Sequence, residues 1–320
     1  MRIPTRNNYI CNKGHKMQEL NQKTNEEKDY GLVSIVMPTY KQDELLHKAV
    51  ESVIEQTYKN IELIVIDDNK EEGYRLANEK YFNALNDQRI IYLQNEFNMG
   101  STATRNKGIW AAKGKYITFL DDDDIYFAEK IEKQASLMNE HSAQVSVCNL
   151  ELCNEEGKIV DKRERRYLNK RKESLLISHL KYHITCTDTM MYDADFLKSI
   201  GGFDEENLGD EFYLMYKALE KKPVFAHLDY TGVRAVVHAQ TGLSSGDNKI
   251  KTEEILIKFK REKFHLLKRK DIRYINMRHN VVLAIAYRKN KARIKCVRSL
   301  VLAAMQCPFG MLGIITGKDR

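Results

Sequence analysis

The sequence predicts an α/β fold in which helices flank a mostly parallel sheet, with a helical extension at the carboxyl terminus. Short apolar runs alternate with helical periodicity from Leu32 onward, which is typical of parallel strands joined by crossover helices. The 320 residues, of which 42% are hydrophobic, suffice for one large or two modest domains. We expect a flexible leader over residues 1–30, an α/β domain over 31–247 with halves at 31–142 and 143–247, and a basic helical region over 248–320.

The first half of the α/β domain shows the alternation of strands and helices most clearly. In the first predicted helix, Leu46, Val50 and Val53 share one face because they are spaced by three and four residues. Trp110 lies beside Ile109 on the third predicted helix and is expected in the core. The predicted strands are 33–37, 61–66, 90–93 and 116–120, and the predicted helices are 43–56, 71–85 and 101–112.

The rest of the chain has a less regular pattern. Between residues 143 and 240, strands such as 145–149 mix with short helices, and the region beyond Asn248 is helical. The apolar stretch from Ser299 to Thr316 is interrupted by Pro308 and by glycines, which disfavours an unbroken membrane-spanning helix. We expect a helix followed by a turn, which either docks on the core or lies on a membrane surface.

Positive charge is concentrated near the carboxyl terminus. Residues 248–300 hold 17 Lys and Arg against 4 Asp and Glu, whereas the whole chain carries only +7. This indicates an anionic partner such as the inner face of the plasma membrane, or else a solvated or homodimer-forming helical tail. No nucleic-acid recognition motif is found, so nucleic acid is not expected as a partner. The six cysteines form no C-x-x-C pair and no signal-like leader is seen, which predicts a cytoplasmic protein, peripheral at most on the membrane.

The run Asp121–Asp124 directly follows the fourth predicted strand. Adjacent carboxylates repel one another unless a cation or a proton intervenes. A hard divalent ion, Mn²⁺ or Mg²⁺, suits such oxygen ligands. The alternative is a solvated loop in which Asp123 or Asp124 caps a following helix.

Three polar loops follow parallel strands and should therefore meet at one edge of the sheet. They are Thr39-Tyr40, Asp67-Asp68 and the aspartate run. Ligands of open α/β sheets bind at this edge. Pro38-Thr39-Tyr40-Lys41 stands where a sugar nucleotidyltransferase needs a glycine-rich loop, and no G-x-G-x-x-G exists for a dinucleotide-dependent oxidoreductase.

Ordered sequence blocks surround these loops. They are VSIVMPTY from Val33, SVIEQTY from Ser52, ELIVIDD from Glu62, NMG at 98–100 with RNKG from Arg105, and GKYITFLDDDD from Gly114. In this order and spacing, the chain from Val33 to Lys130 resembles family 2 of the inverting glycosyltransferases. The resemblance implies a Rossmann-like GT-A fold, with a donor-nucleotide half over 31–142 and an acceptor half over 143–247.

The resemblance also implies roles for the polar residues at the sheet edge. Thr39 and Tyr40 would border the nucleobase, and Asp67 or Asp68 would accept a hydrogen bond from it. Arg105 would reach the base or a phosphate, the alternative being a surface salt bridge with Glu96 or another neighbour. The implied donor-nucleotide residues are Pro38, Thr39, Tyr40, Asp67, Asp68, Arg105, Asp121, Asp122 and Asp123, and the implied metal ligands are Asp123, Asp124 and His238.

A second acidic pair, Asp210-Glu211, resembles the family's Glu-Asp pair at the start of a helix, but in reversed order. Inversion needs a carboxylate that takes the acceptor hydroxyl's proton. Glu211 is our preferred catalytic base and Asp210 the second candidate. Their alternative role is to interact with the helix dipole. His238, which follows the last predicted strand, has a structural role as its alternative.

These features predict a metal-assisted inverting glycosyltransferase. It would move a sugar from a nucleotide-sugar donor, a UDP-sugar by the resemblance, to a hydroxyl of a glycan or lipid-linked acceptor. The alternative is a catalytically degenerate module that binds sugar nucleotides as a scaffold of a polysaccharide-assembly complex.

Overall fold

The computed structural model describes residues 9–13, 29–41, 44–165, 168, 173–205, 208–238 and 246–315. The chain divides into two compact units, Met1–Glu164 with Thr185–Val236, and Arg165–Ile184 with Val237–Arg320. The second unit takes in residues 165–184 as well as the carboxyl-terminal region, and the predicted domain boundary between residues 247 and 248 stays a prediction. Residues 165–184 join this unit in part through a buried ion pair, in which Lys181 Nζ lies 3.1 Å from Asp271 Oδ1.

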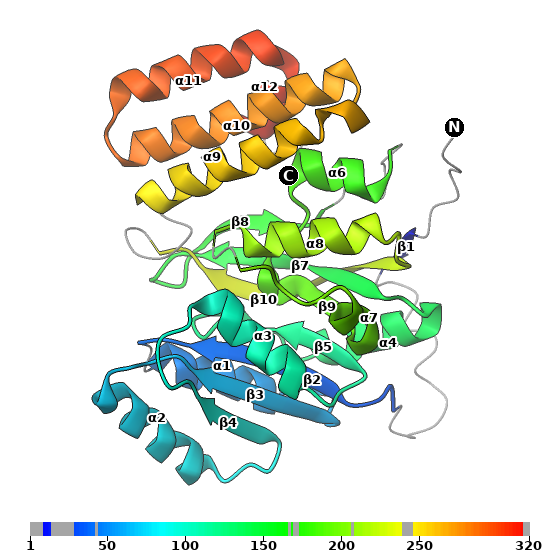
Figure 1. The fold of residues 1–320 in the computed structure, drawn as a ribbon, viewed down its shortest axis with the longest axis vertical. Coiled ribbons are helices and arrows are strands. Elements are labelled where there is room, and N and C mark those ends of the chain that lie inside the picture. Colours follow the sequence, from blue (N-terminus) through cyan, green and yellow to red (C-terminus); the bar gives the residue numbers. More distant parts are fainter. Residues whose placement is uncertain are drawn as a thin grey trace. The chain divides into compact units, whose positions relative to one another are not determined.

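The first unit contains a ten-stranded sheet with helices on both faces (Figure 1). Its main strand order is β1-β10-β7-β9-β5-β2-β3-β4, with β6 paired to β10 and β8 paired to β7. The strands are β1 (Tyr9–Lys13), β2 (Val33–Thr39), β3 (Ile61–Asp67), β4 (Ile90–Gln94), β5 (Tyr116–Phe119), β6 (Ile125–Tyr126), β7 (Val145–Cys153), β8 (Ile159–Arg163), β9 (Met190–Asp193) and β10 (Phe225–Val236). The helices are α1 (Glu44–Ile54), α2 (Glu72–Leu85), α3 (Ser101–Ala111), α4 (Lys130–His141), α7 (Ala194–Ser199) and α8 (Asp210–Glu220), with the 3₁₀ turn η2 (Thr187–Thr189) before β9.

The sheet is mostly parallel, and one reversed strand joins its two parallel parts. Strands β4, β3, β2 and β5 run parallel, and so do β7, β10 and β1. Strand β9 lies between β5 and β7 and is antiparallel to both. The amino-terminal end of β9 therefore lies at the same edge as the carboxyl ends of its neighbours, so that residues preceding β9 can join the loops that follow β5.

The central strands are buried on both faces, which explains why their sequences are mostly apolar, and the buried polar pair within them is Ser34 Oγ donating to Glu62 Oε1. On one face, Ile35 and Met37 of β2 join the apolar side of α1 in the main core cluster. On the other face α3 approaches very closely, because a Cβ atom on Gly108 would lie only 2.4 Å from Val36 Cγ1. A glycine at this helix position thus sets the distance between α3 and the sheet.

The seven predicted strands and helices of the first half are all present, with bounds that differ by at most two residues. Two expectations differ from the structure. Tyr9–Lys13, inside the predicted leader, pairs with β10 as β1, whereas residues 1–8 and 14–28 lie outside the described residues. Trp110 is 58% exposed, so its expected place in the core was wrong. Its neighbour Gly108 faces the sheet instead, and two residues along a helix point in different directions.

The second unit is helical. It consists of α6 (Leu175–Tyr182), α9 (Gly246–Glu262), the 3₁₀ turn η3 (Phe264–Leu266), α10 (Arg269–Lys289), α11 (Arg293–Gln306) and α12 (Pro308–Ile315). Met277 and Val281 of α10 form a small core with Ala303 of α11. Among the described residues no single helix is long and apolar enough to cross a membrane, and the α11–α12 pair, which meets both criteria jointly, is bent by 119°.

Candidate active site

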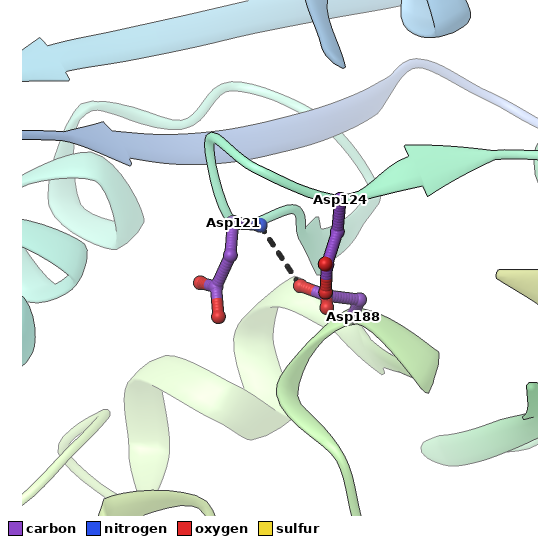
Figure 2. Close-up of side chains that lie close together, drawn as sticks. All are labelled: Asp121, Asp124 and Asp188. Atoms are coloured by element: carbon purple, nitrogen blue, oxygen red, sulfur yellow. Dashed lines mark hydrogen bonds between the residues drawn. The ribbon is translucent and has the colours of Figure 1, made fainter. Parts of the chain in front are cut away.

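Three carboxyl groups converge where β5 ends (Figure 2). Asp121 and Asp124 come from the aspartate run, and Asp188 comes from η2, just before the reversed strand β9. One ligand oxygen from each lies within 4.8 Å of the others. The backbone N–H of Asp121 donates to Asp188 Oδ1 at 2.9 Å, which ties the two segments together.

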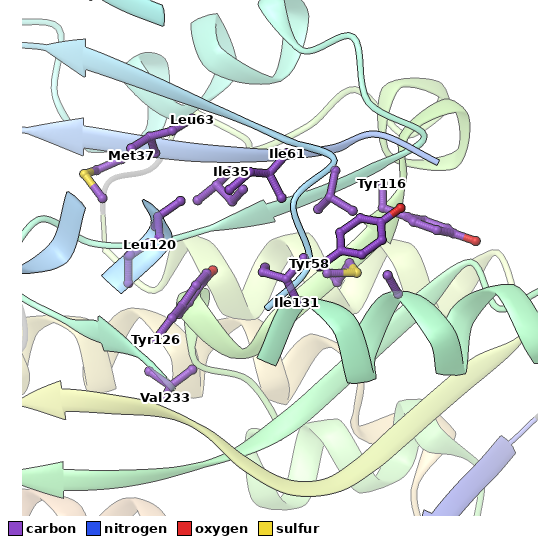
Figure 3. Close-up of a cluster of buried hydrophobic side chains, with 14 of the residues drawn as sticks. Ile35, Met37, Tyr58, Ile61, Leu63, Tyr116, Leu120, Tyr126, Ile131 and Val233 are labelled. Atoms are coloured by element: carbon purple, nitrogen blue, oxygen red, sulfur yellow. The ribbon is translucent and has the colours of Figure 1, made fainter. Parts of the chain in front are cut away.

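The loop that carries the aspartates is anchored at both ends in the core (Figure 3). Leu120 precedes the run and Tyr126 follows it in β6, and both side chains are buried in the same cluster as Val233 of β10. Asp124 Oδ1 also accepts a hydrogen bond from the backbone N–H of Val236 at 2.8 Å. The carboxylates are therefore held near one another by apolar packing on both sides of a short loop.

The acidic cluster is electrostatically unfavourable without a cation or bound protons. Burial, followed by the charge of Asp188, raises the pKa of Asp124 well above its usual value. Burial and the charge of Asp121 raise the pKa of Asp188 to about 7. Asp188 Oδ2 is buried and receives no hydrogen bond from any described residue. Oxygen donors of this kind, on a rigid loop, fit a hard divalent ion such as Mn²⁺ or Mg²⁺.

Arg105 of α3 links this cluster to the second acidic pair. Its guanidinium lies 2.6 Å from Asp121 Oδ1 and 2.8 Å from Asp210 Oδ2, and its side chain is almost completely buried. Burial acts to lower the pKa of Arg105, but the two carboxylates outweigh it and raise that pKa above its usual value. The residue is thus a permanent positive charge between two acidic segments. The surface salt bridge with Glu96, considered as an alternative, is not what forms.

Asp210 and Glu211 open α8 after Gly209, whose φ of 76° lies in the left-handed region that glycine tolerates. Both carboxylate oxygens of Asp210 are engaged, because Oδ2 pairs with Arg105 and Oδ1 accepts from the backbone N–H of Glu211 at 2.9 Å. Burial raises the pKa of Asp210 to about 7, although Arg105 opposes the rise. Asp210 is buried and Glu211 is partly exposed. The neighbouring acids therefore have different surroundings.

Helix α3 positions several parts of the site through consecutive residues. Next to Arg105, the Asn106 side chain donates to Phe203 O at 2.9 Å and accepts from Phe203 N–H at 2.8 Å, which fixes the turn that precedes α8. Lys107 Nζ donates to Gln94 O and to Asn95 Oδ1, both at 2.8 Å, and holds the loop after β4. The block that begins at Arg105 is thus a structural junction of the site.

The second predicted donor loop is tightly bonded within the protein. Asp67 accepts hydrogen bonds from the Asn69 backbone and side chain, from Asn78 and from the Tyr92 hydroxyl. Asp68 Oδ1 accepts from Met99 N–H at 2.8 Å and Oδ2 from Gly100 N–H at 2.9 Å, together with the side chain of Asn95 on Oδ1. The two carboxylates shape the loops after β3 and β4, and their contact with a nucleobase stays a prediction.

The end of β2 lies next to the aspartate run. Pro38 pairs with Ile66, and Thr39 is buried beside them. The backbone N–H of Tyr40 donates to Asp122 Oδ2 at 3.0 Å, and Tyr40 is 42% exposed. Burial and the charge of Asp123 raise the pKa of Asp122 to about 7.

Two of the predicted metal ligands, Asp123 and His238, do not belong to the cluster of three carboxyl groups. Asp123 is partly exposed and is not part of the cluster formed by Asp121, Asp124 and Asp188. His238 belongs to the second unit, so its proposed metal contact stays a prediction. Asp188 was missed by the sequence reasoning. The only signal for it was a single acid within an otherwise apolar and hydroxyl-bearing run before β9.

Comparison with known proteins agrees with this architecture. The family model described as Glycosyl transferase family 2 matches residues 34–201. The chain is 38% identical over 126 residues to UDP-Glc:alpha-D-GlcNAc-diphosphoundecaprenol beta-1,3-glucosyltransferase WfgD of Escherichia coli, covering 39% of this chain and 48% of WfgD. It is 34% identical over 131 residues to the putative teichuronic acid biosynthesis glycosyltransferase TuaG of Bacillus subtilis, covering 41% of this chain and 51% of TuaG. The chain thus spans about half the length of these curated relatives.

Among solved structures, the chain is similar to residues 1–349 of S. aureus TarS in complex with UDP-GlcNAc. The TM-score is 0.55 at 20% identity, and the match covers 89% of this chain and 92% of that one. This likeness shows the fold, which is GT-A. The family model matches more than half of the chain and includes Asp121, Asp124 and Asp188. The chain therefore belongs to glycosyl transferase family 2.

Proposed function

We propose that this chain is a metal-assisted inverting glycosyltransferase, and that it moves a sugar from a UDP-sugar to a hydroxyl of a lipid-linked glycan. The observation that carries the proposal is the pair of acidic segments joined by Arg105. Asp121 of the cation cluster and Asp210 at the start of α8 are both ion-paired to this one residue. One chain segment thus offers carboxylates for a cation, and the other offers a base.

The loops after β2, β3 and β5 are the proposed donor site. They lie at the carboxyl edge of parallel strands, where nucleotides bind in open α/β sheets. The UDP-GlcNAc complex of TarS, which shares the fold, supports a uridine nucleotide as the donor. We propose that Thr39, Tyr40 and Asp68 border the base and that Asp123 contacts the ribose.

Asp124 and Asp188 are the proposed principal ligands of a divalent cation, since Mg²⁺-type ions take one or two carboxylates and complete their shell with phosphate and water. When bound, such an ion would supply Lewis-acid stabilisation of the leaving diphosphate. Asp121 faces the same cluster, but Arg105 already neutralises part of its charge. Asp123 and His238 remain candidate additional ligands.

Glu211 is the proposed catalytic base. Asp210 has both oxygens engaged and is buried, whereas Glu211 is the more exposed of the two acids. A base must approach the acceptor hydroxyl and take its proton as the hydroxyl attacks the anomeric carbon. Asp210 would instead orient the start of α8 through Arg105.

The proposed acceptor is a glycan carried on a lipid, presented at the inner face of the plasma membrane. WfgD, whose name specifies a diphosphoundecaprenol-linked acceptor, supports this choice. The basic second unit adds support, because residues 248–300 carry a large excess of positive charge.

The test incubates the purified chain with a panel of UDP-sugars and a lipid-linked glycan acceptor, with Mn²⁺ or with a chelator. We expect one UDP-sugar of the panel to serve as the donor, and we expect transfer when Mn²⁺ is present and none in the chelator. The product should have the anomeric configuration opposite to that of the donor. Asp124→Asn should abolish transfer, whereas Glu129→Gln at an exposed acid should leave it unchanged. Retention of configuration, or equal transfer in the chelator, would contradict the mechanism. Binding without transfer across the panel would favour the scaffold alternative.

A further inference from the structure

Helix α11 in the second unit exposes a row of large apolar side chains. Ile294, Val297, Val301 and Met305 are spaced by three and four residues, which places them on one face of the helix. Each is between 53% and 86% exposed. Single exposed apolar residues are ordinary on protein surfaces, but a continuous row marks a contact surface.

The inner face of α11 is packed against the core of the second unit, so the exposed row belongs to a helix that is held in place. The residues that pack inward are Ser299 and Ala303, both buried and both small. Ala303 joins Met277 and Val281 in the core of the unit. In a helix of a soluble domain the large apolar residues face the core and polar residues face the solvent. Helix α11 departs from this arrangement, because its inward residues are small and its large apolar residues are exposed.

Helix α12 continues the exposed apolar surface after a sharp bend. Phe309 and Leu312 are exposed, whereas Met311 and Ile314 pack against the small core formed with α10. The bend of 119° between α11 and α12 is stabilised in part by Arg273, whose Nε donates to Gln306 O at 2.7 Å. The packed side chains hold the exposed residues of both helices at the surface.

Basic residues accompany this surface, and the acid recorded beside them is Asp247 of α9, whose Oδ1 accepts a hydrogen bond from Asn290 Nδ2 at 2.8 Å. Arg288, Lys289, Lys291, Arg293, Lys295 and Arg298 lie on the end of α10, the connecting turn and the start of α11. From Ile272 to Ile315 the sequence contains no Asp or Glu. An apolar face with basic residues around it matches the boundary of an anionic bilayer, where acyl chains meet phosphate headgroups.

We propose that the exposed face of α11 and α12 is a docking surface for anionic phospholipid, with the apolar side chains inserted among the acyl chains. The apolar insertion surface consists of Ile294, Val297, Val301, Met305, Phe309 and Leu312. The basic residues bind the lipid phosphates, so electrostatic attraction and apolar insertion both contribute to binding. This goes beyond the proposed transfer reaction and does not depend on which sugar is moved.

The test measures sedimentation of the purified full chain with vesicles of phosphatidylglycerol and phosphatidylcholine in equal parts, or of phosphatidylcholine alone. We expect tight binding to the anionic vesicles that high salt weakens but does not abolish. The triple variant Val297→Gln, Val301→Gln and Met305→Gln should lower the partition coefficient on the order of a hundredfold. Replacing Lys291, Lys295 and Arg298 by Gln should lower it about fivefold per residue on anionic vesicles only.

A matched control is Leu76→Gln, which removes an equally exposed apolar side chain from α2 in the first unit and should leave binding unchanged. A second readout does not depend on a loss of binding. Phe309→Trp in a Trp110→Phe background should show a blue-shifted emission when anionic vesicles are added. Unchanged binding of the apolar triple variant, or no shift for Phe309→Trp, would overturn the proposal. So would a dimer without lipid, seen by light scattering, that the apolar triple variant abolishes, because the face would then cover a second copy.

Discussion

Asp210 and Glu211 are adjacent in the sequence but differ in what surrounds their carboxylates. Glu211→Gln should therefore lower kcat by about 10² to 10⁴, the usual contribution of a general base, with little change in KM for the donor. Asp210→Asn should lower kcat less and should also reduce stability, because Arg105 loses one of its two ion pairs. Steady-state kinetics and denaturant unfolding of both variants would check this. A larger kcat defect in Asp210→Asn, with unchanged stability, would exchange the two roles.

Arg105 is the residue on which the two acidic segments depend. Arg105→Met should destabilise the protein by about 3 to 5 kcal/mol, because Asp121 and Asp210 would be left near each other without their cationic partner. Adding Asp210→Asn to that variant should recover part of the loss. Urea unfolding measures both effects. Lys133→Met is the matched control, since it breaks an exposed pair with Glu129 and should cost less than about 1 kcal/mol. An equal cost for the two single variants would refute the structural role of Arg105.

The acidic cluster should make cation binding depend on pH. Asp188 has a folded pKa of about 7, raised from 3.8, so protonation stabilises the metal-free protein at low pH and this stability is lost as pH rises through about 7. Protons compete with the metal, and Mn²⁺ affinity should fall about tenfold per pH unit below that value. Thermal unfolding with and without Mn²⁺ should show a larger rise in Tm at pH 8 than at pH 6. Asp188→Asn should reduce this difference without removing it, because burial also raises the pKa of Asp124. A pH-independent rise in Tm of the unsubstituted chain would argue against the cluster as the ligand set.

At the scale of elements, α3 packs so closely on the sheet at Gly108 that there is no room for a side chain. Gly108→Ala should destabilise the protein by about 1 to 3 kcal/mol, because the added Cβ would meet Val36 and Ile66 at 2.4 and 2.8 Å. Gly73→Ala in α2 is the matched control, since nothing lies within 4 Å of its added Cβ. That variant should be stabilised by about 0.5 to 1 kcal/mol. Equilibrium unfolding gives the free energy of unfolding of both variants. A loss of stability in both would mean that helix propensity does not decide the effect of the substitution at position 73.

The elements that the sequence predicted well are those with a local pattern. Strands β2 and β3 are mostly apolar, and α1 repeats its apolar residues at helical spacing. Trp110 shows where local reasoning fails. Its apolar character suggested burial, but the direction of a helical side chain is set by spacing relative to Gly108 and Ile109, which face the sheet and the core.

At the scale of the whole molecule, Lys130 should leave a signature in the pH dependence of stability. It is completely buried, donates to Thr118 Oγ1 at 2.6 Å and lies over the Tyr126 ring. Burial lowers its pKa from 10.5 to about 7. Between these two values the folded chain binds fewer protons than the unfolded chain, so the free energy of unfolding should rise with pH, by at most about 1.4 kcal/mol per unit.

The comparison that isolates Lys130 is with Lys130→Met, which removes the titrating group and keeps most of the apolar stem. Lys260, whose pKa burial lowers from 10.5 to about 8, titrates in the same range and acts in the same direction. Only the difference between the two unfolding free energies, measured from pH 7 to 10, therefore reports on Lys130. Parallel profiles would show that the buried amine keeps its proton.

The candidate site was predictable where it follows strands and unpredictable where it depends on long-range pairing. The aspartate run and the β2 and β3 loops follow parallel strands, so their shared edge could be inferred before any coordinates. Asp188 could not be inferred, because it reaches the site only through the antiparallel pairing of β9 with β5. The ion pairs of Arg105 depend in the same way on where α8 begins, more than a hundred residues later in the chain.

The reversed direction of β9 also has a consequence for how the site can change during evolution. Asp188 and Asp121 meet in space but are 67 residues apart in the sequence, and β6, α4, β7, β8 and α6 lie between them. A single codon change at position 188 can add or remove a carboxylate without altering the loops after β2, β3 and β5. The strength of the proposed cation binding would therefore drift or be selected separately from the proposed recognition of the nucleotide.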